Sequence, residues 1–340
     1  MNSTQLDRTN IANDLGPLST DSTKLLNVFF YIDYVIMPIL SASGIIGNIL
    51  TLIVLFQYGF KESFNVLLTS LAIADLVYSF TVLAISMDHF VTDQTSRELL
   101  EAVISAHLYP LNEVAYNTSA FIIAALSLQR MIVVWFPFKA SFIFTPFRTL
   151  VIVISINLAM FLLYSPRCFR WILLPVDSST NKNDSMYVVQ HDIYFYDNDS
   201  DYVLSSTIIK FLSLMVIAPS IISVCSFITI AKIITSSDIV KKMSKTFYRK
   251  RLNETKLEIM NLSICSCIVF LTVIPTTMNP EVFYFRGPRK TPPLATLLLY
   301  NDLVPFLMQI NASIHFLIYV TYSSKFLKIF QRTITCGINS

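Results

Sequence analysis

The sequence predicts an all-α membrane protein, a seven-transmembrane helix bundle with a short amphipathic helix after the seventh span. Of its 340 residues, 54% are hydrophobic and only 14% are charged, whereas about a quarter of residues are charged in soluble domains. The apolar residues lie in long runs, each close to the ~20 residues that cross a hydrocarbon core as a helix. The same hydrophobic fraction excludes a disordered chain, and the presence of only 6 glycines excludes a collagen-like one.

Seven runs between charged residues define the predicted spans. Asp75 and Glu113 are the single charges of the second and third runs, and the other five runs have none. The runs cover residues 34–60, 63–87, 102–129, 149–166, 211–231, 259–280 and 303–324. Their residues do not alternate between apolar and polar as β-barrel strands do, which indicates helices.

The chain then divides into an extracellular tail (1–33), a seven-transmembrane domain (34–322) and a cytoplasmic amphipathic helix with its tail (323–340). If the C-terminus is cytoplasmic, the inner side holds 14 Lys and Arg with 4 Asp and Glu, and the outer side 10 basic with 17 acidic residues. Because cytoplasmic loops have the Lys and Arg excess, the N-terminus is predicted outside. The tail has no cleavable signal pattern, so we expect the first span to direct membrane insertion. The expected location is the plasma membrane.

The second outer loop, about residues 171–201, is acidic and aromatic. Residues 187–190 and 193–196 have a strand-like pattern within it. Glycosylation sequons lie on the predicted outer side at Asn2, Asn183 and Asn198, where the modification is expected.

Two features on the inner side each leave two interpretations open. The third inner loop includes KKMSKTFYRKR, which either contacts anionic lipids of the bilayer or forms a basic surface for an acidic partner. Cys336 follows a basic amphipathic segment and is either palmitoylated or an unmodified thiol. Only Cys168 of the five cysteines lies near the outer face, so no intramolecular extracellular disulfide is available.

Polar residues within the spans are the candidate functional groups, since burying them in lipid is costly. We name these residues the polar seam, expected to run from the outer half of the bundle to its inner mouth. On the third span, residues at steps of three or four share one face: Asn112, Tyr116, Ser119, Ile123, Leu126 and Arg130. One face of the seventh span likewise holds Asn311, His315 and Tyr319, at steps of four. The first span contributes Asn48 and the second contributes Asp75. Hydrogen bonding between helices without a signalling role is the alternative, favoured for Asn48.

The order of these residues resembles that of the rhodopsin-like G-protein-coupled receptors over about residues 35–332. The matching motifs are GN, LAIADL, SLQRMIVVWFPFK, Pro219 and Pro275 in spans five and six, and NASIHFLIY followed by SSKFLKIF. YSPRCFRW, LMVIAPS and NASIHFLIY are most similar to the invertebrate FMRFamide-type neuropeptide receptors.

The resemblance implies two groups of residues inside the bundle. The activation network comprises Asn48, Asp75, Ser119, Pro275, Asn311, His315 and Tyr319. The contact with a heterotrimeric G protein involves Gln129, Arg130, Pro137 and Phe138. The loop WFPFKASF would complete a cleft that opens when the sixth span swings outward about Pro275, and agonist binding must favour that open state.

The sequence departs from the family pattern at several positions. Gln129 replaces the acid that pairs with the arginine of span three, so we hypothesise raised basal signalling. His315 replaces an Asn or Asp beside a sodium pocket of Asp75, Ser119 and Asn311, so we hypothesise weak or absent sodium modulation. An Asp75–His315 pair and a neutral His bonded to a neighbour remain equal alternatives. Further departures are Met131, Val273 and Ser105, which replace the usual Tyr, Trp and Cys.

The resemblance narrows the ligand by exclusion. Amine receptors have an Asp at the position of Asn112, and opsins have a Lys at that of Gln309, so a peptide or a small environmental molecule remains. The acidic outer face favours a cationic ligand. The candidate ligand-binding residues are Asn112, Glu113, Tyr116, Phe283, Tyr300, Asp302 and Gln309. A peptide ending in Arg-Phe-amide would place its guanidinium on an acid and its ring among the aromatic residues; the alternative, favoured for Asp302, is a solvated interfacial acid.

The sequence therefore predicts a neuropeptide receptor rather than an enzyme, with no cofactor, bound metal or nucleic-acid partner. A chemosensory receptor for a small molecule is the alternative. A transporter is less favoured because internal repeats and intramembrane charge pairs are not evident. An intramembrane hydrolase is also less favoured, because His315 is the only histidine expected within the membrane.

Overall fold

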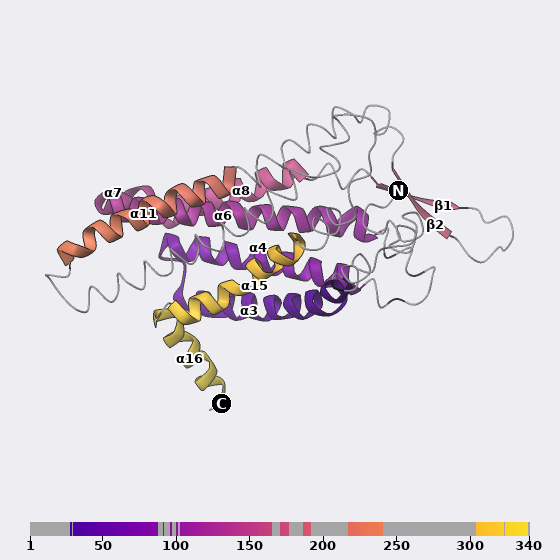
Figure 1. Ribbon diagram of the computed structural model, residues 1–340, viewed down its shortest axis with the longest axis horizontal. Helices are drawn as coiled ribbons and strands as arrows, with labels where there is room; N and C mark the ends of the chain where they lie inside the picture. The colour runs from indigo at the N-terminus through magenta and orange to yellow at the C-terminus, as the bar shows by residue number, and fades with distance from the viewer. Residues whose placement is uncertain are drawn as a thin grey trace.

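The structure is a computed structural model in which long helices lie side by side (Figure 1). The described residues are 28, 30–87, 91, 96, 100, 103–164, 171–176, 186–191, 217–240, 304–322 and 324–338. Predictions for Phe283, Tyr300, Asp302 and Pro275, for the three glycosylation sequons and for the sixth span lie outside them.

The first two long helices form an antiparallel pair joined by a tight turn. A π-helical turn, η1 (Ile32–Ile36), leads into α3 (Met37–Tyr58), and α4 (Ser63–Ser86) returns. Gly59 ends α3 with a φ of 74°, in the left-handed region that side chains with a Cβ disfavour. The Asn65 amide donates to the Gly59 carbonyl over 3.2 Å, which fixes the turn against α4.

The next three helices are separated by prolines. A second π-helical turn, η3 (Ile104–Leu108), precedes α6 (Tyr109–Trp135); α7 (Pro137–Ile143) and α8 (Pro146–Tyr164) follow. Proline is favoured in the first turn of a helix, where its missing N–H has no intrahelical partner in any case.

Three further helices complete the described part. They are α11 (Ala218–Val240), α15 (Val304–Tyr322) and α16 (Ser324–Ile338). Gly44 of α3 lies against Ser313 of α15, and Gly47 lies against Phe316, so both positions advance in the same direction. The helices α3 and α15 are therefore parallel, as expected for the first and seventh spans of a bundle.

A hairpin is the β structure in the described residues. The strands β1 (Trp171–Val176) and β2 (Met186–His191) pair antiparallel, with Trp171 opposite His191. The strand predicted at 187–190 is confirmed, but its partner precedes it in the chain. The second predicted strand, 193–196, lies outside the described residues.

Four described helices are long and apolar enough to cross a membrane: Ile32–Gln57, Ser63–Ser86, Ala106–Trp135 and Pro146–Tyr164. They confirm the first four predicted spans, with shifted boundaries. The third helix continues past Arg130 and the fourth begins before Arg148, because a basic side chain near a helix end does not stop the helix. The described helix α11 extends past the predicted end of the fifth span at residue 231, and its apolar part is Ala218–Lys232.

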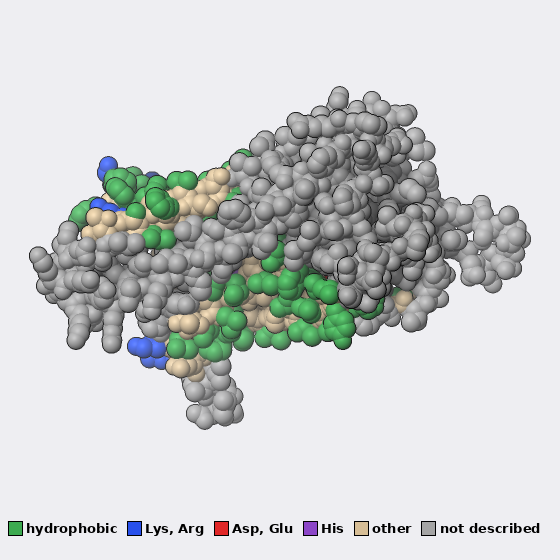
Figure 2. Space-filling view, in the orientation of Figure 1, with side chains coloured by type: hydrophobic (Ala, Val, Ile, Leu, Met, Phe, Trp, Pro, Cys, Tyr) green, Lys and Arg blue, Asp and Glu red, His purple; other side chains and the backbone are tan. Residues whose placement is uncertain are grey.

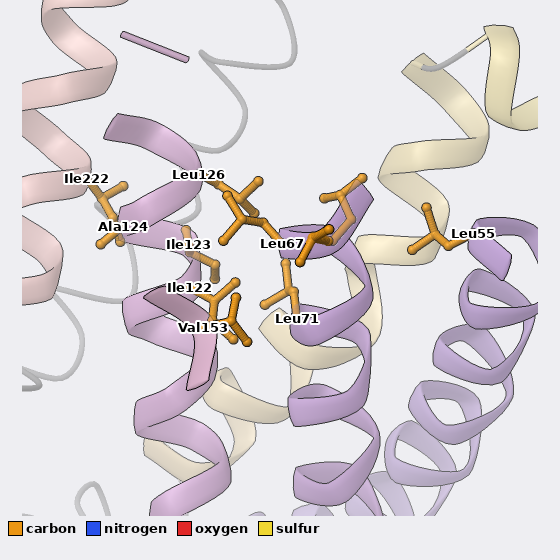
Figure 3. Packing of buried hydrophobic residues seen from close by; sticks show 11 residues of the cluster. Leu55, Leu67, Leu71, Ile122, Ile123, Ala124, Leu126, Val153 and Ile222 are labelled. Carbon is orange, nitrogen blue, oxygen red and sulfur yellow. The ribbon is translucent and has the colours of Figure 1, made fainter. Parts of the chain in front are cut away.

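The main hydrophobic core lies where α4, α6, α8 and α11 meet. Figure 3 shows Leu67 and Leu71 of α4 near Ile123 and Leu126 of α6. Val153 of α8, Ile222 of α11 and Leu55 of α3 belong to the same cluster. This core occupies the half of the α4–α6 contact nearer the C-terminal end of α6, and polar residues lie on either side of it.

Candidate functional site

The part of the polar seam near the N-terminal end of α6, the predicted outer end, joins α6 to α4. The Asn112 amide donates to the Thr81 hydroxyl over 2.8 Å. One turn further along α6, the ring of Tyr116 lies 5.6 Å from that of Tyr78, at 48°. Two of the residues predicted to bind ligand therefore rest on α4.

Glu113 lies beside this pair and is half-buried. Its Oε2 atom is shielded from solvent, and its backbone carbonyl accepts a hydrogen bond of 2.7 Å from the Asn117 amide. A carboxylate sheltered from water attracts a cation more strongly than a solvated one does. Its position near the N-terminal end of α6, the predicted outer end, is compatible with the predicted role.

The centre of the seam is Asp75, which is buried on α4. Its Oδ1 accepts a hydrogen bond of 2.6 Å from the Ser119 hydroxyl of α6. Its Oδ2 lies 3.6 Å from Nε2 of His315 on α15, a distance within ion-pair range but too long for a hydrogen bond. The structure thus brings Asp75 and His315 together, as the pairing alternative predicts.

Neither of those two facing atoms has a hydrogen-bond partner among the described residues. A small inward movement of α15 would let the imidazole donate to the carboxylate and satisfy both atoms. No group of three or more His, Cys, Asp or Glu side chains that could hold a metal ion occurs in the described part of the chain.

The seam continues along α15 toward the inner end. Asn311 is buried one turn before His315. The rings of His315 and Tyr319 are stacked, with their centroids 6.3 Å apart. The ring centroid of Tyr319 lies 5.8 Å from that of Phe326 on α16. A chain of contacts therefore leads from Asp75 to α16.

Gln129 and Arg130 lie near the C-terminal end of α6, the predicted inner end, where both face α4. The Gln129 amide donates to the Ser63 hydroxyl over 2.6 Å. The Arg130 guanidinium lies over the Phe64 ring at 5.2 Å. With the pairs described above, these contacts follow α4 and α6 in antiparallel order from one end to the other.

Beyond Arg130, aromatic side chains point away from the bundle. Phe138 is 95% exposed on α7, the helix that begins at Pro137. Phe138 therefore lies on the surface, just beyond the C-terminal end of α6, and its predicted contact with a G protein stays a prediction. Cys336 lies in the last turn of α16.

Asn48 of the predicted activation network joins two helices. Its amide donates to the Ala312 backbone carbonyl over 3.1 Å. This bond links α3 to α15. It supports the structural interpretation favoured for this residue.

Gln309, a predicted ligand contact, is fully buried. Its Nε2 donates to Ser79 Oγ over 3.1 Å and to Ser313 Oγ over 3.0 Å. The Ser313 hydroxyl also reaches the Leu40 carbonyl of α3, at 3.1 Å. We name Gly44, Ser79, Gln309 and Ser313 the Gln309 cluster; in this conformation it joins three helices.

Ser79, Ser313 and Gly44 were not among the predicted site residues. A Cβ on Gly44 would lie 2.7 Å from each serine hydroxyl and 3.0 Å from Gln309 Nε2. The available signal was the small-residue face of Ser41 and Gly44 on the first span, since small residues let membrane helices approach closely. Thr81 and Ser63 were also missed, because serine and threonine are common in membrane helices.

Comparison with known proteins identifies the family. The sequence model of the serpentine type 7TM GPCR chemoreceptor Srw family matches residues 34–337. An FMRFamide receptor of Drosophila melanogaster is 24% identical over 320 residues, which are 88% of this chain and 53% of that protein. The FMRFamide peptide receptor frpr-18 of Caenorhabditis elegans is 24% identical over 302 residues, 83% of this chain and 64% of that protein.

The chain thus spans between about half and two thirds of the length of these relatives. The family match covers nearly all of the described helices, and those helices form the bundle on which the seam lies. The chain belongs to the serpentine 7TM GPCR chemoreceptor Srw family and is a multi-pass G-protein-coupled receptor of the membrane.

Proposed function

We propose that this chain is a rhodopsin-like, seven-span receptor of the plasma membrane for an amidated, cationic neuropeptide. The supporting observation is the continuous line of contacts from Asn112 at one end of α6 to Arg130 at the other. Such a line offers a physical connection between a ligand at the outer end and a G protein at the inner end. It supports a signalling protein better than a transporter.

The ligand proposal rests on chemistry and on relatives. Two relatives named as FMRFamide receptors align with more than four fifths of the chain. A guanidinium from an Arg-Phe-amide peptide would pair with Glu113, and its terminal ring would lie near Tyr116. Phe283, Tyr300 and Asp302 remain proposed contacts from the other side of the ligand.

Transmission requires that the agonist bind the active conformation more tightly than the resting one. We propose that a ligand between α6 and α15 changes the separation of Asp75 and His315, which now stand 3.6 Å apart. The stacked pair of His315 and Tyr319 would pass this shift to the inner end, with the sixth span moving about Pro275. Arg130, Pro137 and Phe138 would then contact the G protein, which performs the nucleotide exchange.

The test is a screen of amidated neuropeptides on cells expressing the chain, with calcium and cAMP both measured. A peptide ending in Arg-Phe-amide should activate wild type. The Arg130→Ala variant, at equal surface density, should bind that peptide but give no response. Activation by peptides that lack a basic residue, with none by basic amidated peptides, would contradict the proposal.

The second candidate is a chemosensory receptor for a small molecule, because the matching family is described as chemoreceptors. The same cells exposed to a panel of small environmental molecules distinguish the two functions. A response to a small molecule, together with silence toward all amidated peptides, would favour the chemosensory function.

A further inference from the structure

The segment between α6 and α8 exposes large aromatic side chains. Phe142 of α7 is 72% exposed and Phe147 of α8 is 75% exposed. Ile143 and Phe138, in the same segment, are exposed as well. Each large apolar side chain loses roughly 1.5–3 kcal/mol when it stays in water instead of an apolar environment. An apolar environment around these rings would therefore stabilise the exposed arrangement.

Basic groups accompany these rings. The Arg148 guanidinium lies 4.8 Å from the Phe142 ring centroid and donates to the Phe142 carbonyl. Lys139 Nζ lies 5.9 Å from the ring of Phe136. The sequence contains no Asp or Glu from residue 114 to residue 176. The patch formed by Lys139, Phe142, Phe147 and Arg148 therefore attracts anions, and we name it the α7–α8 patch.

A third cation adds to this field from a neighbouring helix. Lys232 of α11 lies over the Trp135 ring at the end of α6, 4.8 Å from its centroid. Figure 2 shows hydrophobic and basic side chains together at the end of the molecule where Figure 1 labels α7. Aromatic rings with Lys and Arg are the combination typical of membrane–water interfaces.

The patch continues into the outward surface of α8. Residues at helical spacing after Phe147 are exposed and apolar on the same face: Leu150, Val151, Ile154 and Leu158. Since α8 is one of the four described helices that are long and apolar enough to cross a membrane, we expect this face to lie in hydrocarbon. Its continuity with the patch favours a lipid over a soluble protein as the occupant.

We propose that the α7–α8 patch binds the headgroup of an anionic phospholipid of the inner leaflet. The Arg148 guanidinium and the Lys139 ammonium contact the phosphate, and Phe142 and Phe147 lie among the upper acyl-chain carbons. The proposal does not depend on which ligand activates the receptor. It assigns to this segment a function separate from the proposed contact between Phe138 and a G protein.

Native mass spectrometry of the purified full chain in detergent tests this. The probes are phosphatidylserine and, as the neutral comparison, phosphatidylcholine. Because one basic group near an anionic surface contributes about 1 kcal/mol, Arg148→Gln should lower retention of phosphatidylserine about fivefold. Arg148→Gln with Lys139→Gln should lower it further, and Arg148→Lys should retain most of it. Phosphatidylcholine adducts should not change.

Lys328→Gln is the matched control, because Lys328 is an exposed basic residue of α16, outside the patch. It should leave phosphatidylserine retention unchanged. If Lys328→Gln and Arg148→Gln lost phosphatidylserine equally, the lipid would be held by general charge attraction, and the proposed site would be overturned. Unchanged retention in the double variant, or full displacement by soluble glycerophosphoserine, would overturn it as well.

Discussion

The residues around the buried acid Asp75 distinguish two possible roles for it, holding a sodium ion or pairing with a histidine. A sodium ion needs several oxygen ligands, and Asp75 is surrounded by Ser119 on one side and by an imidazole on the other. A protonated His315 would compete with a cation for Oδ2. The residue is arranged better for pairing with His315 than for holding sodium.

The first prediction at the residue scale concerns sodium. Replacing choline chloride by sodium chloride at constant ionic strength should change agonist affinity by less than the roughly fivefold that marks the low end of allosteric coupling. Radioligand competition on membranes gives the affinity in each salt. A clear loss of affinity with sodium that disappears in Asp75→Asn would contradict this prediction.

A second residue-scale prediction concerns basal signalling. Gln129 has no charge to hold Arg130, and its amide is bonded to Ser63. Gln129→Glu should lower nucleotide exchange on the G protein without ligand, because a carboxylate beside Arg130 stabilises the resting state.

Ser63→Ala is the control for the lost hydrogen bond, since it removes the acceptor and adds no charge. It should not lower ligand-free exchange. Equal ligand-free exchange of wild type and Gln129→Glu, at equal surface density, would count against the hypothesis.

At the scale of the elements, the Gln309 cluster holds α3, α4 and α15 together. Gly44→Ala should destabilise the receptor by about 1–3 kcal/mol through overpacking, although alanine gains up to about 1 kcal/mol in helix propensity. The introduced Cβ would lie 2.7 Å from Ser79 Oγ and Ser313 Oγ. Thermal unfolding of the purified receptor in detergent should give a lower midpoint.

Removing the two hydroxyls provides the companion experiment. In a background of Ser79→Ala with Ser313→Ala, adding Gly44→Ala should lower the midpoint less than it does in wild type. If Gly44→Ala lowered the midpoint equally in both backgrounds, the introduced Cβ would not be destabilising the receptor through the two serine hydroxyls.

The helices also show which features can be predicted from the sequence and which cannot. Steps of three and four placed Tyr116 and Ser119 on the face of α6 that meets α4, because a helix has one period. Gln309 was predicted to contact the ligand, and this stays a prediction; the structure buries its side chain against serines of two helices. Periodicity identifies a face but not the depth of a residue or its partner, since both depend on the neighbouring helix.

At the scale of the whole molecule, charge sorting predicts the topology. Four spans and the parallel directions of α3 and α15 agree with the bundle predicted from the uncharged runs. The hairpin β1–β2 was only half predicted, because pairing between distant strands depends on the fold around them. The orientation stays a prediction, as do the three proposed divisions of the chain.

Glycosylation tests that orientation. Asn183 and Asn198 lie in the predicted outer loop, so peptide-N-glycosidase treatment should increase the gel mobility of the protein from cells. The shift should shrink in Asn183→Gln with Asn198→Gln and disappear when Asn2→Gln is added. A protein whose mobility never changes, while an antibody to its C-terminus labels intact cells, would reverse the topology.

The central claim is that an acid at the outer end of α6 receives a basic peptide. The most direct measurement compares Phe-Met-Arg-Phe-amide with its uncharged citrulline analogue on wild type and on Glu113→Gln. A lost charged hydrogen bond is worth at least about tenfold in potency, so citrulline should lose that much on wild type and almost nothing on Glu113→Gln. Asp33→Asn is the control, because Asp33 is another acid of the predicted outer side. In this variant the citrulline analogue should lose as much potency as it does on wild type. Equal citrulline losses on wild type and Glu113→Gln would contradict the pairing.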